Sequence, residues 1–127
     1  MQRIEGQFRF SASDLMRFAG CRHATALDRA YALGEGPKPG EESEEAVILQ
    51  NHGDAHEIGY LHRLKASGRQ LEEITRGMPL EEGVAETRRL LAEGAEIIYQ
   101  GALLNGCWGG WTDFLERVER PSLLGDH

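Results

Sequence analysis

The sequence predicts an α/β fold in which helices pack on a small mixed β-sheet. Apolar residues at helical spacing dominate the first two thirds of the chain, and two β-rich runs fill most of the last third. With 127 residues, the chain is long enough for one domain with a real core. We expect a single, incomplete domain over 1–127, with a helical N-terminal part and loop over 1–43 and the other elements over 44–127.

Two short helices are expected near the N-terminus. Ser11 precedes Asp14 by three residues, which resembles a capping box and predicts that a helix begins at Ala12. A glycine then interrupts the pattern, and apolar residues at helical spacing predict a second helix over 23–33. The glycines and prolines over 34–40 cannot hold a helix and predict a loop.

A long helix is expected over 44–67. Its apolar positions fit an amphipathic helix of about twenty residues, which Gly68 ends. A short strand over 69–75 follows, and Pro79 in the first turn opens a further helix over 80–92. The apolar positions of the long helix are Val47, Ile48, Ile58, Leu61 and Leu64.

The last third of the chain predicts a β-hairpin. Two β-rich runs, over 96–104 and 107–118, flank Asn105-Gly106, and this dipeptide strongly favours a two-residue hairpin turn. The glycine pair at 109–110 lies inside the second run. A glycine pair within a strand predicts a bulge or a close backbone approach, which often lies beside an active site.

Composition narrows the classes of function. The chain has no apolar run near the ~20 residues of a membrane helix and no basic-then-apolar leader, so we expect a soluble, cytoplasmic protein without a membrane partner. The formal net charge of -7 argues against binding nucleic acid by bulk electrostatics. A site that binds phosphate through a divalent cation is itself acidic, however, so the negative net charge does not exclude such a site.

Asp113 interrupts an apolar stretch of the second β-rich run. A carboxylate flanked by Trp111, Phe114 and Leu115 would lose solvation unless it met a cation or several donors. Two interpretations stay open at this point: an ordinary aspartate at an edge or turn, and a metal ligand. Trp111 and Trp108 present a similar choice between core packing and stacking on an unpaired base.

The long helix carries histidines that raise the question of zinc. His52 and His56 are four residues apart and share a helix face, as zinc ligands do. The sequence from His56 to Tyr60 is not H-E-x-x-H, and His62 is six residues further on, so a zinc protease is excluded. The alternative for each histidine is a solvated or partly buried side chain with a backbone partner.

Four motifs in a fixed order resemble a known family. They are Ser11-Ala12-Ser13-Asp14-Leu15 with Phe18, Cys21, Arg22 and His23; Gly53-x-x-His56-Glu57-x-x-x-Leu61; Tyr99-Gln100-Gly101; and Gly109-x-x-x-Asp113-Phe114-Leu115. The set resembles the RecB-like branch of the PD-(D/E)xK nucleases, above all a group often joined to a downstream helicase. The resemblance covers nearly the whole chain and implies a restriction-endonuclease-like core.

The resemblance implies a metal-dependent DNA nuclease, a hydrolase of DNA repair. His56 and Asp113 match the positions that bind Mg²⁺ or Mn²⁺, which polarises the phosphoryl oxygen and supplies hydroxide near neutral pH. Glu57 and Gln100 are expected to lie behind these ligands. The family adds an acidic ligand and a lysine in D/E-x-K on the next strand, and this chain reaches His127 where that strand would follow.

We therefore expect the N-terminal portion of such a nuclease, truncated before the D/E-x-K strand. Whether this chain is itself an enzyme stays open, because we expect it to bind metal weakly and to cut DNA poorly or not at all. The partners of the complete protein would be DNA and a helicase in cis or in trans. An exposed sheet edge would favour a homodimer. The alternative function is a non-catalytic, nuclease-like module that binds protein.

Cys21 matches the first iron–sulfur ligand of related nucleases. A [4Fe–4S] cluster needs four thiolates, whereas the chain has two cysteines and Cys107 does not fit the pattern. We expect a cluster only in a longer parent protein, and a packed, inert Cys21 in this chain. The two cysteines form neither a CxxC pair nor a disulfide framework.

Overall fold

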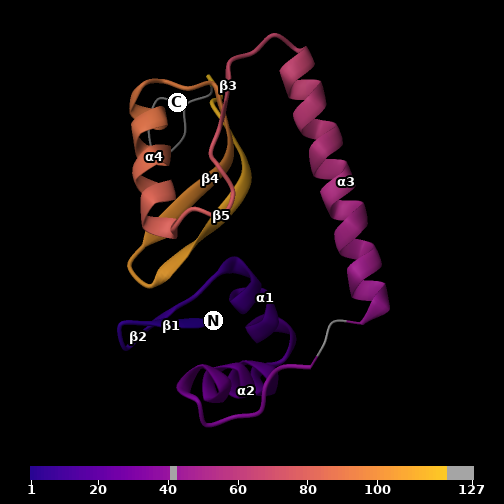
Figure 1. The fold of residues 1–127 in the computed structure, drawn as a ribbon, viewed down its shortest axis with the longest axis vertical. Helices are drawn as coiled ribbons and strands as arrows, with labels where there is room; N and C mark the ends of the chain where they lie inside the picture. The colour runs from indigo at the N-terminus through magenta and orange to yellow at the C-terminus, as the bar shows by residue number, and fades with distance from the viewer. Residues whose placement is uncertain (41–42, 120–127) are drawn as a thin grey trace. The chain divides into compact units, whose positions relative to one another are not determined.

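The computed structural model describes residues 1–40 and 43–119, and this part of the chain is α/β, with four helices and two small sheets (Figure 1). The chain forms two compact units. Unit 1 is Met1–Val47 with Leu104–Gly110, and unit 2 is Ile48–Leu103 with Trp111–His127. The elements in chain order are β1 (Gln2–Ile4), β2 (Gln7–Arg9), α1 (Ala12–Gly20), α2 (Arg22–Leu33), α3 (Glu44–Ala66), β3 (Leu71–Glu73), α4 (Leu80–Ala92), β4 (Ile97–Asn105) and β5 (Trp108–Glu116).

Unit 1 begins with a hairpin that the sequence analysis did not predict. Strands β1 and β2 pair antiparallel, with Gln2 opposite Arg9. Glu5 and Gly6 form the turn, both with positive φ (49° and 82°). Phe10 then forms a parallel bridge with Trp108 of β5, so the N-terminal segment also pairs with the tip of the second hairpin.

The helix boundaries in unit 1 follow local signals. The predicted capping box is confirmed, because Ser11 accepts from the Asp14 amide and Asp14 accepts from the Ser11 amide. Helix α2 begins at Arg22, one residue before the prediction, and ends at Leu33, because Gly34 takes a left-handed conformation with φ of +79°. Burial alone would raise the pKa of Asp14, but hydrogen bonds from the N-terminal ammonium and Ser11 lower it overall.

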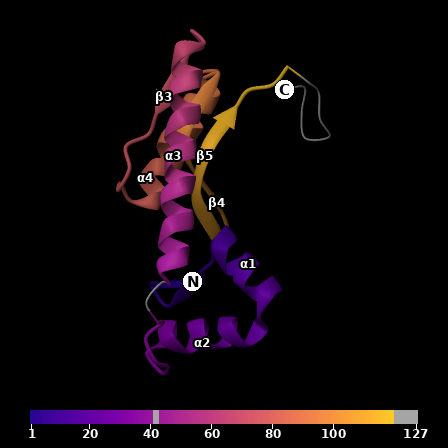
Figure 2. The same ribbon diagram turned by 90° about the vertical axis from the view of Figure 1, so that its right-hand side faces the viewer.

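Unit 2 places its mixed sheet between two helices. The strand order is β3-β4-β5, and β3 is parallel to β4, with Leu71 opposite Ile97. Helix α4 is the crossover that parallel pairing requires. Figures 1 and 2 show α3 on one side of this sheet and α4 on the other. The turn of the β4–β5 hairpin is Gly106-Cys107, one residue later than predicted, with φ of +58° at Gly106.

The core lies between α4 and the sheet. Ile74, Leu90 and Ile98 form a buried cluster, against which Leu115 of β5 packs. Thr87 of α4 is 1% exposed. Its hydroxyl donates to the Gly83 carbonyl at 2.8 Å and accepts from the Ala102 amide of β4, also at 2.8 Å. This hydroxyl therefore ties the helix to the sheet.

Helix α3 is less amphipathic than the sequence pattern predicted. Only Leu61 and Leu64 are buried, at 7% exposure each. The other three apolar positions of the predicted pattern, Val47, Ile48 and Ile58, are exposed. The helix contacts the sheet through polar and aromatic side chains instead, as described below. Among the residues that the structure describes, no helix has the length and apolarity to cross a membrane.

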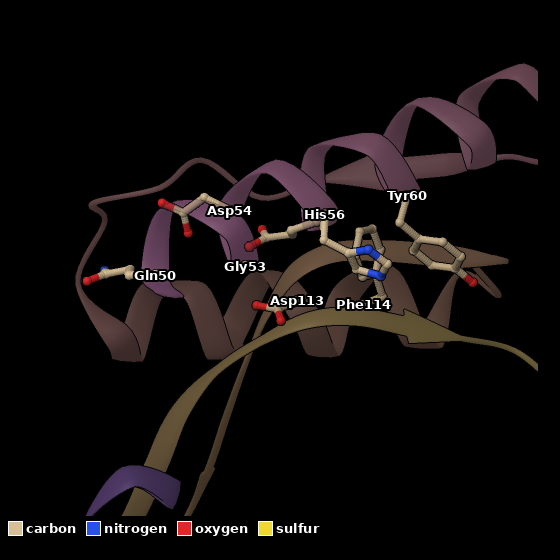
Figure 3. A pocket seen from close by; sticks show the side chains of 8 residues that line it. Gln50, Gly53, Asp54, His56, Tyr60, Asp113 and Phe114 are labelled. Carbon is tan, nitrogen blue, oxygen red and sulfur yellow. The ribbon is translucent and has the colours of Figure 1, made fainter. Parts of the chain in front are cut away.

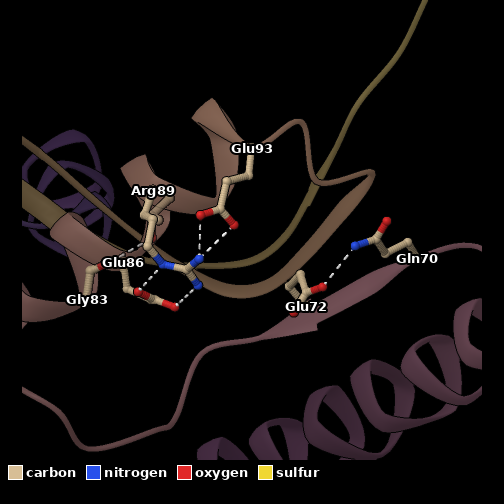
Figure 4. Close-up of polar contacts among 7 residues, drawn as sticks. Gln70, Glu72, Gly83, Glu86, Arg89 and Glu93 are labelled. Atoms are coloured by element: carbon tan, nitrogen blue, oxygen red, sulfur yellow. Dashed lines mark hydrogen bonds and ion pairs between the residues drawn. The ribbon is translucent and has the colours of Figure 1, made fainter.

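The outer face of α4 carries an ion-pair cluster (Figure 4). Arg89 donates to Glu86 and to Glu93, which lie three residues before it and four residues after it. The hydrogen bond to Glu86, followed by the one to Glu93, raises the pKa of Arg89. These side chains are solvent-exposed, so the pairs contribute little to stability. At the edge of the sheet, Gln70 donates to Glu72.

Gly83 gives a test of the packing between α4 and the sheet. A Cβ at Gly83 would overlap the Trp111 ring and lie 2.9 Å from the Ala102 Cβ. We predict that Gly83→Ala lowers the free energy of unfolding by about 1–3 kcal/mol through overpacking. Gly59→Ala in α3 is the matched control, because no atom lies within 4 Å of a Cβ there. It should raise stability by up to about 1 kcal/mol, the helix preference of alanine over glycine.

Urea unfolding followed by circular dichroism measures both variants. Equal stability of the two would show that α4 does not approach the sheet this closely.

Candidate functional site

A cleft of about 670 Å³ lies between α3 and β5, entirely within unit 2 (Figure 3). Its helical wall is one face of α3, because the lining residues recur at intervals of three and four. Its other wall is the edge strand β5. The lining residues are Gln50, Gly53, Asp54, His56, Glu57, Tyr60, Asp113 and Phe114.

The structure brings His56 and Asp113 together at this cleft. They are distant in the sequence, yet Figure 3 shows both side chains in the space between α3 and β5. Asp113 is exposed to solvent, so its apolar neighbours in the sequence do not desolvate it, and the choice between an edge aspartate and a metal ligand stays open. The reason for this exposure is its place on an edge strand, where a side chain can reach water. His52 and His62 do not line the cleft.

The Glu57 carboxylate is the structural centre of the cleft wall. Its Oε1 accepts from Arg76 Nη2 at 2.6 Å, from the Tyr99 hydroxyl at 2.6 Å and from Gln100 Nε2 at 2.7 Å. Arg76 also donates to the Tyr99 hydroxyl at 3.0 Å. Glu57 is only 14% exposed, so these donors replace the water that its charge has lost.

The same contacts shift the pKa values of the donors. Burial, followed by the hydrogen bond to Glu57, raises the pKa of Tyr99. The hydrogen bond to Tyr99, followed by the charges around it, raises the pKa of Arg76. Both groups therefore stay protonated as donors across neutral pH. Glu57, next to His56 on α3, lines the cleft itself, whereas Gln100 of β4 contacts Glu57 and does not line the cleft.

Gln100 adopts an unusual backbone conformation within β4. Its φ is +60°, in the left-handed region that non-glycine residues seldom occupy. Successive residues of a regular strand point to opposite faces, yet Tyr99 and Gln100 both reach Glu57. This break in the alternation is what a β-bulge produces. The 109–110 glycine pair was expected to mark a bulge or a close backbone approach, and the Gly109 amide donates to the Phe10 carbonyl at 2.9 Å.

Aromatic and polar contacts fix the other end of the cleft. Tyr60 packs edge-on against Phe114 at 4.9 Å, and Tyr99 lies 5.1 Å from the same ring. The Tyr60 hydroxyl donates to Glu116 at 2.6 Å, and Arg69 donates to the other Glu116 oxygen at 2.7 Å. The hydrogen bond from Tyr60, followed by that from Arg69, lowers the pKa of Glu116. These contacts attach α3 to β5.

The donor set of the cleft fits a hard divalent cation in part. Carboxylate oxygens and an imidazole are ligands of Mg²⁺ and Mn²⁺, and Asp54, His56 and Asp113 all line the cleft. Arg76 offsets the charge of Glu57, whereas no ion pair is recorded for Asp54 or Asp113 among the described residues. Within that part of the chain, no group of three His, Cys, Asp or Glu side chains is placed to hold a metal ion.

Both cysteines are exposed and unbridged. Cys21 separates α1 from α2, and its amide donates to the Arg17 carbonyl at 2.8 Å. The expectation of a packed Cys21 is therefore wrong, because the junction between two helices leaves its side chain in solvent. Its role as an iron–sulfur ligand in a longer parent stays a prediction.

Sequence reasoning missed Arg76 and Tyr60. Arg76 lies in the turn between β3 and α4, where a single arginine carries no local signal. Tyr60 follows Glu57 by three residues on the same helix face, which is a signal that the sequence did contain.

Comparisons with protein-family models, with curated proteins and with solved structures found no match to this chain. The resemblance to RecB-like nucleases therefore rests on the motifs alone.

The strained backbone of Gln100 gives a testable order of stabilities. Gln100→Ala removes the bond to Glu57 and keeps a Cβ at positive φ, whereas Gln100→Gly removes the bond and relieves the strain. We predict that Gln100→Ala is the less stable of the two by about 1 kcal/mol. Leu103 of β4 has no positive φ and is 46% exposed, so it is the control. At Leu103 the alanine variant should be the more stable.

Urea midpoints of the four variants give this comparison. The same order at both positions would contradict a left-handed Gln100.

The Glu116 contacts predict a dependence of stability on pH. Because folding lowers the pKa of Glu116 below its ordinary value of 4.5, its contribution is complete above that value and is lost as pH falls through the folded pKa. We predict that wild type exceeds Glu116→Gln in stability at pH 7 and that the difference shrinks on acidification. Chemical unfolding at several pH values measures this. Glu119→Gln, an exposed carboxyl nearby, is the control, and the same pH dependence in that variant would contradict the assignment.

Proposed function

We propose that this chain is the N-terminal portion of a metal-dependent DNA nuclease of the RecB-like PD-(D/E)xK type, built on a restriction-endonuclease-like core. One observation carries the proposal: His56 from α3 and Asp113 from β5, the two positions that match the family motifs, line the same cleft. In the proposal, a further strand with an acidic residue and a lysine completes the site. DNA is the partner, cytoplasmic DNA repair is the setting, and a helicase acts in cis or in trans.

His56 and Asp113 would hold Mg²⁺ or Mn²⁺ in this site. A bound divalent cation polarises a phosphoryl oxygen and makes hydroxide available near neutral pH. Both side chains are exposed and can exchange solvent for a ligand. Asp54 lies one turn from Glu57 on the same lining face and adds negative charge that attracts a cation.

Glu57 and its three donors, Arg76, Tyr99 and Gln100, would orient His56 in this site. Residues behind a metal ligand fix its direction and are important for affinity. Glu57 is next to His56 in the chain, and its carboxylate is held from three directions by Arg76, Tyr99 and Gln100. This restricts the turn of α3 that carries His56. Strain concentrated at Gln100 is also typical of functional sites.

Metal titration tests the proposal. We predict that the chain binds Mn²⁺ weakly and that His56→Gln and Asp113→Asn each weaken this binding at least about tenfold. His52→Gln is the matched control, because His52 lies one turn away on α3 and does not line the cleft. Paramagnetic broadening of histidine signals and calorimetry give the affinities. Cleavage of single-stranded and duplex DNA by this chain should be slow or absent.

Two outcomes would contradict the proposal in part or in full. Equal Mn²⁺ affinity of the His56 and His52 variants would show that His56 does not bind the metal. This result would favour the alternative, a non-catalytic module that binds protein. Rapid cleavage that depends on His56 would show that no further strand is required.

A further inference from the structure

Unit 1 contains a second, separate cleft of about 270 Å³. This volume is near the lower end of ligand pockets, roughly 300 Å³, and suits one flat ring system. Phe18 and Trp108 line it and are each 45% exposed. Large aromatic side chains gathered around one opening indicate a binding surface more often than scattered exposed residues do. The lining residues are Met1, Phe10, Asp14, Leu15, Phe18, Thr25 and Trp108.

The aromatic rings continue beyond the cleft. Trp108 lies 5.3 Å from Phe10, and Phe10 lies 6.2 Å from Phe8 in a stacked arrangement. The backbone bridge between Phe10 and Trp108 fixes the first of these contacts. The three rings therefore form a connected aromatic track. Bases of an unpaired strand stack on such rings irrespective of sequence.

Two arginines of α2 border the aromatic cleft and the track. Arg22 lies 5.3 Å above the Phe18 ring, and Arg29 lies 5.6 Å above the Phe8 ring. Seven residues apart, they share a helix face and line an open groove of about 550 Å³. Thr25 lines both this groove and the aromatic cleft, so the two hollows adjoin. Glu35 is the acidic residue among those that line the groove.

The balance of charges over residues 1–33 differs from that of the whole chain. Residues 1–33 contain five arginines and three acidic residues, whereas the whole chain has a net charge of -7. Asp28 is paired with Arg17 at 2.9 Å, and Asp14 with the N-terminal ammonium. Among the described residues, no ion pair includes Arg22 or Arg29. A polyanion with flat apolar faces complements this surface.

We infer that the aromatic cleft and the adjoining arginine groove bind single-stranded DNA, with a base in the cleft and its phosphates along Arg22 and Arg29. A duplex does not fit, because its bases are already stacked and paired. The two polar side chains that line the cleft are not open to a ribose 2′-hydroxyl: Asp14 accepts from Ser11 and from the N-terminal ammonium, and the Thr25 hydroxyl is fully buried. The inference rests on the proposed function for DNA as the ligand, but it needs no metal.

Fluorescence anisotropy with a labelled oligothymidylate, in EDTA at low salt, tests the inference on the full chain. We expect Trp108→Ala to weaken binding between about fivefold and a hundredfold, the range for loss of one stacked base. Trp108→Phe should restore most of the affinity. Tyr31→Ala is the matched control, because Tyr31 on α2 is 45% exposed and lines neither hollow.

The two arginines of the groove should determine part of the salt dependence of DNA binding. Replacing Arg22 and Arg29 together by glutamine should lower the slope of log affinity against log salt by about 1.4, as expected for two lost phosphate contacts on a single strand. Arg88→Gln, an exposed arginine of α4 in unit 2, should leave that slope unchanged.

Several results would overturn the inference: equal affinity of the Trp108→Ala and Tyr31→Ala variants, binding of duplex as tight as single strand, or tighter binding of oligouridylate than of oligothymidylate. A dimer that Trp108→Ala abolishes, without DNA binding in wild type, would assign the surface to a second copy of the chain. Because the assay contains no metal, it can fail while the Mn²⁺ titration succeeds, and the reverse also holds.

Discussion

The hydrogen bonds to the Glu57 carboxylate are the interactions on which the candidate site of unit 2 depends. Its Oε1 accepts hydrogen bonds from Arg76 in the loop after β3, from Tyr99 of β4 and from Gln100, where β4 departs from regular geometry. A buried carboxylate with fewer donors would lose more solvation energy than its partners return. The apolar contribution of α3 is small, with Leu61 and Leu64 as its buried residues. Polar contacts, rather than an apolar stripe, therefore determine how this helix lies on the sheet.

Some elements could be predicted from the sequence because local signals set their ends. The capping box at Ser11 and the glycines at 34, 68 and 94 determine helix ends by local geometry, and the helices end close to them. The β4–β5 hairpin follows from its turn glycine. The β1–β2 hairpin was missed because three-residue strands leave too short a pattern to recognise.

The candidate site was only partly predictable, for a physical reason. His56 and Asp113 carry motif signals, and the structure places both at one cleft. The left-handed backbone of Gln100 has no local cause in the sequence, since glutamine does not favour it, and arises from a partner distant in the chain. The exposure of Val47 and Ile48 also could not be predicted, because periodicity shows that a face is apolar but not whether another element covers it.

The bond between the Thr87 hydroxyl and the Ala102 amide has a consequence for local opening of the protein. An amide within a strand usually pairs with a neighbouring strand, and its proton exchanges with solvent when the sheet frays. The Ala102 proton is instead held by a helix side chain, so separation of β4 from β5 alone does not release it. Its exchange rate reports how often α4 lifts from the sheet.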